Sequence, residues 1–292
     1  MNSPTHFDGA GSEGSSRLAA LIIGSLSVWL AAAACSRTSE ARLGDSQAET
    51  VTQSDTAVRA PIMPLLHAHA DLLLEDSSAQ SVKGWVEFAH WWSSDAITAL
   101  SGSWIVPPPP EAKDSQTLFL FLGLQDDSTK VTELLQPVLQ WGLSPAGGGR
   151  YWSLSCWYLH VPAFEEPLLT ASSAVRVAEG ESIDGYVRRR EMNDTLSVWE
   201  CGAKTDAGVS TGLAVISGMD LRYSYAALEA YGKSMSCDHY PEAQLTAFTD
   251  IRLDTDWQPV DSSKIQWDTT VVVPGCNHRV DVKGASEIDL HY

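Results

Sequence analysis

The segment 134–158, LLQPVLQWGLSPAGGGRYWSLSCWY, constrains the fold more than any other part of the chain. It predicts two strands joined by a glycine-rich turn at 146–149. Because side chains alternate across a strand, Gln136 and Gln140 share one face of the first strand. Glutamines surrounded by tryptophan and tyrosine favour a lined groove, since solvated sheet faces usually carry Thr, Lys and Glu. An ordinary hairpin with polar surface residues is the alternative interpretation.

Strand-like segments continue along the chain on both sides of this hairpin. The run 118–122, LFLFL, is apolar throughout, as in a fully buried strand. Later segments rich in β-branched and aromatic residues alternate with turn residues, and helical periodicity is hard to find after the N-terminal region. Roughly ten to thirteen strands without crossover helices predict an all-β fold. We expect an antiparallel two-sheet β-sandwich of the jelly-roll kind, forming one domain over 61–292.

The charge balance restricts the partners of the chain. Its 292 residues include 19 basic and 37 acidic residues, for a formal net charge of −18. This excess of negative charge argues against binding to nucleic acid and against electrostatic attraction to anionic lipid. The acidic residues are scattered along the chain, which indicates solubility and is compatible with work in acid.

The N-terminal region predicts export. Arg17 precedes the apolar run 18–34, which is short for a transmembrane helix and ends in small residues before Cys35. The sequence LAAAAC resembles a bacterial lipobox, which implies that 1–35 is a signal peptide and that Cys35 becomes lipidated. The polar stretch 36–60 predicts a flexible tether. We therefore expect anchoring to the cell envelope at the outer membrane through the lipid alone. A buried hydrophobic helix that ends in cysteine is the alternative.

Four further cysteines suggest disulfides. An even number in an oxidising compartment permits two bridges with three possible pairings. Cys237 and Cys276 both lie in loop-like sequences and are the first expected pair, which would leave Cys156 and Cys201. None of the four has the close spacing of a zinc site.

Metal and cofactor sites are not predicted. His67, His69 and Asp71 would share one face of a strand, as metal ligands must, and some metallohydrolases carry such a pair of histidines on a barrel strand. The repeated strand–helix pattern of that barrel is missing here, so a polar segment leading into the domain is the favoured interpretation. The chain also lacks the HExxH and P-loop motifs. We expect no metal and no cofactor.

The order of the strand motifs resembles a known family. The elements LFLFLGLQ, LLQPVLQW, YWSLSCWY, VAEGESIDGYV, YAALEAYG and LTAFTDIRL follow one another between residues 103 and 253. This succession resembles the eqolisin (glutamic peptidase) group, whose fold is a concanavalin A-like pair of antiparallel sheets. The resemblance covers about half of the chain. It implies an endopeptidase that uses one glutamine and one glutamate.

The resemblance points to particular residues. Leu135-Gln136 matches the leucine–glutamine pair of the family's glutamine strand, so Gln136 is the candidate catalytic glutamine. The late strand fits in two registers: one makes Glu229 the catalytic glutamate, and the other places Tyr225 at that position. An acidic residue of the family's WYEWYP motif falls at Cys156 and is missing. Glu200 is a second, weaker candidate carboxylate.

The implied chemistry needs both groups. A carboxylate can take a proton from water as general base and later return it to the leaving amine. A glutamine amide can donate a hydrogen bond to the developing oxyanion, a contribution of about 3 kcal/mol. Burial among tyrosines would raise the pKa of Glu229, and we expect activity in acid.

Two other functions compete with this hypothesis. One is a non-catalytic, lectin-like binding module whose aromatic faces take a glycan or polypeptide ligand. The other is a glycoside hydrolase, whose paired carboxylates leave no local signature. The residues expected to contact the substrate or ligand are Gln140, Trp141, Tyr151, Trp157, Tyr225 and Tyr231.

Overall fold

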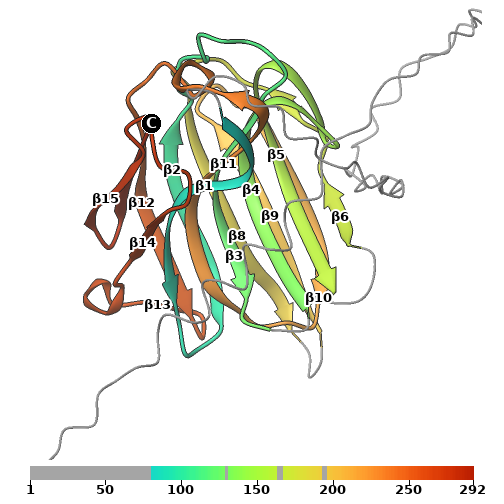
Figure 1. Cartoon of the computed structure of the whole chain (residues 1–292). Helices are drawn as coiled ribbons and strands as arrows, with labels where there is room; N and C mark the ends of the chain where they lie inside the picture. The colour runs from blue at the N-terminus through green and yellow to red at the C-terminus, as the bar shows by residue number, and fades with distance from the viewer. Residues whose placement is uncertain (1–79, 129–130, 163–166, 193–195) are drawn as a thin grey trace, which may run out of the picture.

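The computed structural model describes residues 80–128, 131–162, 167–192 and 196–292, and it confirms the all-β sandwich. Two eight-stranded antiparallel sheets stack face to face (Figure 1). Along sheet A, the order is β14 (Asp268–Val271), β1 (Gln80–Trp92), β11 (Leu221–Met235), β3 (Thr117–Asp126), β4 (Val131–Ser144), β5 (Gly147–Pro162) and β6 (Leu168–Ala171), and β7 (Val175–Arg176) also pairs with β5.

Sheet B packs against the inner face of sheet A and also has eight strands. Two short 3₁₀ helices, η1 (Cys237–His239) and η2 (Ser262–Lys264), lie in the connections. Along sheet B, the order is β10 (Ser210–Ser217), β9 (Ser197–Thr205), β8 (Ser182–Met192), β2 (Ile97–Ile105), β12 (Leu245–Thr255), β16 (Glu287–His291) and β15 (Arg279–Gly284), and β13 (Gln258–Pro259) also pairs with β12.

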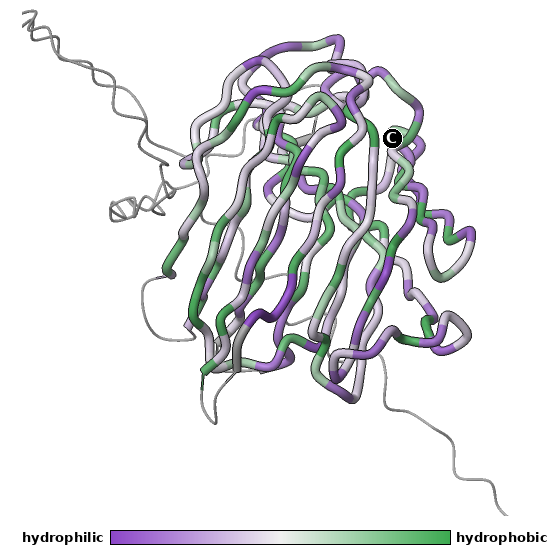
Figure 2. The backbone as a smooth tube through the Cα atoms, turned by 180° about the vertical axis from the view of Figure 1, so that it is seen from behind, coloured by the Kyte–Doolittle hydropathy of each residue, from purple (hydrophilic) through white to green (hydrophobic). Residues whose placement is uncertain are grey.

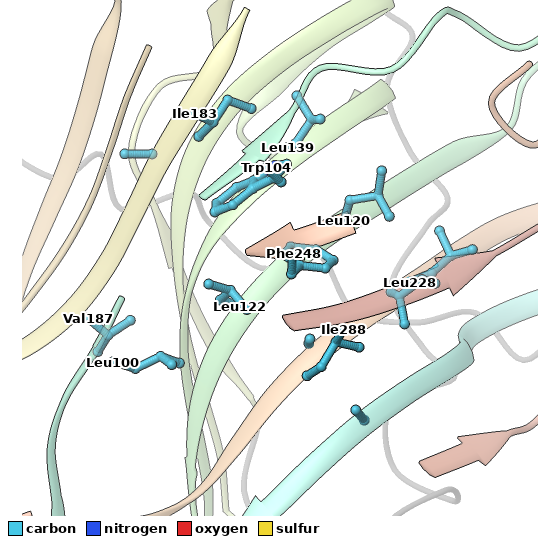
Figure 3. Packing of buried hydrophobic residues seen from close by; sticks show 14 of the residues in the cluster. Leu100, Trp104, Leu120, Leu122, Leu139, Ile183, Val187, Leu228, Phe248 and Ile288 are labelled. Atoms are coloured by element: carbon cyan, nitrogen blue, oxygen red, sulfur yellow. The ribbon is translucent and has the colours of Figure 1, made fainter. Parts of the chain in front are cut away.

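The main core fills the space between the sheets. Figure 3 shows Leu120 and Leu122 of β3 directed toward Trp104 of β2 and Phe248 of β12. Burial of each such large apolar side chain contributes about 2–3 kcal/mol. Hydrophobic stretches run along the strands and hydrophilic ones are frequent in their connections (Figure 2). Strand β3 is buried along its whole length, as the apolar run 118–122 predicts.

The predicted hairpin exists, but its turn lies earlier than expected. The turn is formed at Pro145 and Ala146, and the glycines begin strand β5. Gly147 and Gly148 have positive φ angles of 103° and 97°. A Cβ atom at Gly148 would lie 2.4 Å from Nε2 of Gln140, so the glycine makes room for that side chain.

The predicted disulfide between Cys237 and Cys276 is confirmed, with a Cα–Cα distance of 5.0 Å. Cys156 and Cys201 are buried free thiols. Cys35 and the string of His67, His69 and Asp71 lie outside the described residues, as do the segments 1–35 and 36–60. Within the described ranges, no helix is long and apolar enough to span a membrane.

Candidate active site

The candidate site lies on the face of sheet A that is turned away from sheet B, called here the outer face. Alternation along β3 directs Leu118, Leu120 and Leu122 into the main core. The intervening Phe119 and Phe121 therefore occupy the outer face. There they form a second apolar cluster, which consists of Phe119, Phe121, Val138, Trp157 and Ala227.

A pocket opens on this outer face, over strands β11, β3, β4, β5 and β6. The space between its walls is about 640 Å³ when the open solvent at its mouth is counted. Most of its wall is apolar. Among the described residues that line it, Glu229 is the only one with a carboxyl group. The lining residues are Phe119, Leu134, Gln136, Pro145, Trp157, Leu159, Val161, Pro167, Leu168, Leu169, Glu229 and Tyr231.

Glu229 is a buried carboxyl group at the wall of the pocket. Its side chain is 3% exposed, and Oε2 accepts a hydrogen bond from the Tyr231 hydroxyl at 3.3 Å. Oε1 is buried and finds no partner among the residues that the structure describes. Burial raises the pKa of Glu229 to about 7, although the Tyr231 hydrogen bond acts in the opposite direction. Near neutral pH, the carboxyl therefore exists in both protonation states.

Gln136 lines the same pocket from β4. It is 5% exposed, and its Oε1 is buried with no partner in the described part of the chain. A Cβ atom added to Gly123 of β3 would lie 3.4 Å from Cβ of Gln136, so the two residues are neighbours. A buried polar atom without a partner is costly, so this amide oxygen is a candidate to accept a hydrogen bond from a ligand.

Strand register determines which residues of the outer face lie opposite one another. Tyr225 of β11 pairs with Gly123, the neighbour of Gln136. Glu229 pairs instead with Phe119, which in turn pairs with Gln140. Glu229 is thus displaced by four residues along the strands from the row that contains Gln136.

The distance implied by this register is large. Two strand spacings and four residues correspond to about 16 Å between the Cα atoms of Gln136 and Glu229 on a flat sheet. Phe121 lies between them, because it pairs with Ala227 on one side and Val138 on the other. The two polar groups share a pocket, but they approach it from opposite sides of Phe121.

Gln140 belongs to the hairpin. It is 0% exposed, and its Nε2 donates to the carbonyl oxygens of Gly142 at 2.8 Å and Gly147 at 2.9 Å. Its Oε1 accepts from the Ser144 hydroxyl at 2.8 Å. Both polar atoms of the amide are therefore occupied by hydrogen bonds within the hairpin. The sequence-based expectation that Gln140 contacts a ligand has no support in this geometry.

The predicted aromatic contacts separate into different environments. Trp141 lies in the main core and packs against Trp152 with ring centroids 5.5 Å apart, so it does not face the pocket. Tyr151 lies near the hairpin end, where Arg176 covers its ring at 4.9 Å. Trp157 does line the pocket, and its indole Nε1 donates to the Ser155 hydroxyl at 2.6 Å.

Tyr225 and Tyr231 occupy neighbouring parts of the outer face. Tyr225 packs against Trp85 with ring centroids 5.1 Å apart and stacks on His90 at 5.9 Å. Burial raises the pKa of Tyr225, so its phenol stays protonated. Tyr231 lines the pocket beside Glu229, and its ring packs edge-on against Phe119 at 5.8 Å.

The weaker candidates lie elsewhere. Glu200 is on sheet B, where it pairs with Arg188 at 2.9 Å and Arg190 at 2.7 Å. Cys156, at the position of the family's missing acidic residue, is buried in the main core. Among the described residues, no cluster of His, Cys, Asp and Glu could hold a metal ion.

Sequence reasoning missed the buried carboxyl of Glu87 on β1. It is 0% exposed, and neither of its oxygens has a partner among the described residues. Burial raises the pKa of Glu87 to about 9, although Arg279 lowers it. The segment GWVEFAHWW gives no signal of this burial, because a β-bulge between Trp85 and Glu87 interrupts its alternation.

Comparisons with known proteins give matches among solved structures. No protein-family model and no curated protein matches the chain. Scytalido-glutamic peptidase, solved with a peptide-based transition state analog, has 17% identity and a TM-score of 0.49, with 74% of this chain and 100% of that chain covered. The eqolisin SCP-B, in complex with the tripeptide Ala-Ile-His, has 18% identity with the same TM-score and coverage. These structures belong to the family that the sequence motifs resemble, and at this identity they assign no role to a residue.

Proposed function

We propose that the chain is a peptidase-like hydrolase. It binds a polypeptide on the outer face of sheet A and uses Glu229 as the catalytic base that cleaves it. The observation that carries this proposal is the Oε1 atom of Glu229, which is buried and unpaired in a residue that lines an apolar pocket. Such an oxygen can hold a water molecule and accept its proton during attack on a carbonyl carbon. The resemblance of the strand motifs to glutamic peptidases adds support.

The pocket wall suggests the substrate class. Leu134, Leu159, Val161 and Leu169 offer an aliphatic surface beside the ring of Trp157. An apolar wall of this kind favours a large aliphatic or aromatic side chain near the scissile bond, because burial of that side chain supplies binding free energy. It gives the hydroxyl groups of a sugar few hydrogen-bonding partners, so a polypeptide fits better than a glycan.

The pKa of Glu229 sets the expected pH dependence. A general base must be ionised, and burial raises the pKa of Glu229 to about 7. Activity should therefore rise as pH increases through 7, since less than about one carboxyl in a hundred is ionised at pH 5. This pH dependence differs from the activity in acid that the sequence led us to expect, and the assay below distinguishes the two.

Gln136 has a binding role in this proposal. Because Phe121 separates it from Glu229, its amide serves the backbone of an extended substrate some residues away from the scissile bond. Loss of the amide should weaken binding more than it slows the chemical step.

A non-catalytic peptide-binding protein is the second candidate. One observation favours it: the residue that pairs with Gly123, beside Gln136, is Tyr225 rather than a glutamate. In the second register of the family resemblance, this tyrosine occupies the position of the catalytic glutamate. A protein of this kind would retain the groove without the hydrolysis.

Cleavage of a denatured protein substrate from pH 4 to 9 tests both candidates. Wild type is compared with Glu229→Gln, Gln136→Ala and the control Glu200→Gln, whose carboxylate pairs with arginines on sheet B. The peptidase proposal requires activity that Glu229→Gln abolishes and Glu200→Gln preserves. A folded wild type that binds peptides without cleaving them would establish the second candidate.

The cellular location is a separate proposal. The lipobox-like sequence supports export and lipidation at Cys35, which would place the groove outside the cytoplasm. Mass spectrometry of the protein from its native envelope would detect a diacylglyceryl group on Cys35, and an unprocessed N-terminus would contradict the proposal.

A further inference from the structure

Tyr231 and Glu229 form a compact pair on β11. They are two residues apart on a strand, so both side chains are on the outer face. The Tyr231 hydroxyl donates to Oε2 of Glu229 at 3.3 Å, and edge-on packing against Phe119 holds the tyrosine ring. The pair thus places a carboxylate and a hydroxyl donor within one hydrogen-bond length of each other, at the wall of the pocket.

We propose that the Tyr231 hydroxyl is the hydrogen-bond donor that stabilises the oxyanion formed when water activated by Glu229 attacks a peptide carbonyl. This inference rests on the proposed function and names a catalytic residue for it. The two oxygens of Glu229 are already differentiated: Oε1 is unpaired and can hold the water, whereas Oε2 holds the tyrosine. A carbonyl bound next to that water lies within reach of the phenol.

The other amides of the outer face are unsuitable for this task. Gln140 is in the same row as Glu229, but its amide is bonded to Gly142, Gly147 and Ser144. Gln136 lies beyond Phe121, and its Cα atom is about 16 Å from that of Glu229 by strand spacing. A donor contributes to the chemical step only where the oxyanion develops.

The proposed step balances without a cofactor. Water gives a proton to Oε1 of Glu229 while its oxygen bonds to the carbonyl carbon, and the π electron pair moves to the carbonyl oxygen. Protonation of Glu229 weakens its hold on the Tyr231 hydroxyl, which then donates to the new oxyanion. Collapse of the intermediate breaks the C–N bond, and Glu229 returns the proton to the leaving nitrogen. The products are a carboxylic acid and an amine.

The test compares Tyr231→Phe with two matched variants. Tyr231→Phe keeps the ring that packs on Phe119 and removes the hydroxyl alone. Tyr223→Phe removes a hydroxyl from the same face of β11 outside the pocket lining. Gln136→Ala removes the distant amide. Steady-state rates on a peptide substrate are measured for each across pH 5 to 9.

We expect Tyr231→Phe to lower kcat about 100-fold with KM little changed, as when an oxyanion donor is removed elsewhere. Its pH profile should also move to higher pH, because the Tyr231 hydrogen bond lowers the pKa of Glu229. Tyr223→Phe should match wild type, and Gln136→Ala should raise KM.

Two results would overturn the inference while leaving the peptidase proposal intact. One is a Tyr231→Phe variant with the kcat and pH profile of wild type. The other is a large fall in kcat in Gln136→Ala and none in Tyr231→Phe. Full activity of Glu229→Gln, or a folded wild type that cleaves nothing, would reject the proposed function itself together with this inference.

Discussion

Gln136 lies beside Tyr225 on the outer face of sheet A, with Gly123 between them, whereas Glu229 is four residues further along β11. The glycine brings no side chain between them, and the side chains of Leu134, Gln136 and Phe121 border this point. A carboxylate at the position of Tyr225 would therefore be able to meet the amide of Gln136 across it. In this protein a phenol occupies that place, and the carboxylate has a tyrosine partner of its own.

This arrangement predicts a gain of function. In a Glu229→Gln background, Tyr225→Glu should produce cleavage that is at least about tenfold above background. The new activity should vanish on Gln136→Ala, because the amide and the new carboxylate then act on the same carbonyl. Loss of the Tyr225 ring contacts should cost about 3 kcal/mol of stability. Peptide cleavage assays on the variants provide the measurement, with Tyr225→Gln as the isosteric control.

The apolar pocket predicts how selectivity can be changed. Leu169 of β6 lines the pocket and is partly exposed, so Leu169→Arg should fold. The introduced cation should reduce cleavage next to aliphatic residues about tenfold and favour acidic ones, because a buried charge attracts its opposite. A peptide library read by mass spectrometry would reveal the shift. If the variant cleaved next to the same residues as wild type, the substrate side chain would not bind in this pocket.

The buried carboxyl of Glu87 predicts that the protein is more stable in acid. Its pKa is raised to about 9 in the folded state, above the ordinary value of 4.5. Its contribution to stability is therefore fully present below about pH 4.5 and is lost as pH rises through 9, with a total on the order of several kcal/mol. Urea unfolding from pH 4 to 9 would measure it. Glu87→Gln should reduce the slope by about one proton and leave a dependence below pH 7 that comes from Glu229, whereas exposed Glu242→Gln should preserve the whole dependence.

The bridge between Cys237 and Cys276 predicts a large effect of reduction. It joins residues 39 apart in the sequence, and the chain-entropy relation gives about 4 kcal/mol for a loop of that size. Dithiothreitol should lower the free energy of unfolding by about this amount. The double variant Cys237→Ser/Cys276→Ser should start at the lower value and not respond to the reductant, since Cys156 and Cys201 are free thiols. Urea unfolding curves with and without reductant separate these outcomes.

Local pattern was sufficient for much of the architecture. Alternation and the apolar run of β3 predicted the sandwich, and the loop context of Cys237 and Cys276 predicted their pairing. Period-two alternation along the late strand also places Tyr225, Glu229 and Tyr231 on one face. These are properties of a single strand or loop, which the sequence specifies directly.

Relations between strands could not be predicted in the same way. The register of β11 on β3 includes a shift between Leu221 and Tyr223, and no sequence pattern predicts this shift. The hydrogen bonds of the Gln140 amide depend on the direction of the carbonyl oxygens of Gly142 and Gly147. The backbone conformation of the turn sets that direction. Both features decide which polar groups meet at the site.

Glu87 also makes folding a proton-uptake reaction. At pH 7 its carboxyl is ionised in the unfolded chain and protonated in the folded one, so close to one proton is released on unfolding. The heat absorbed in a calorimeter then includes the heat of protonating the buffer. Melting in phosphate and in Tris would give different apparent enthalpies for the same conformational change.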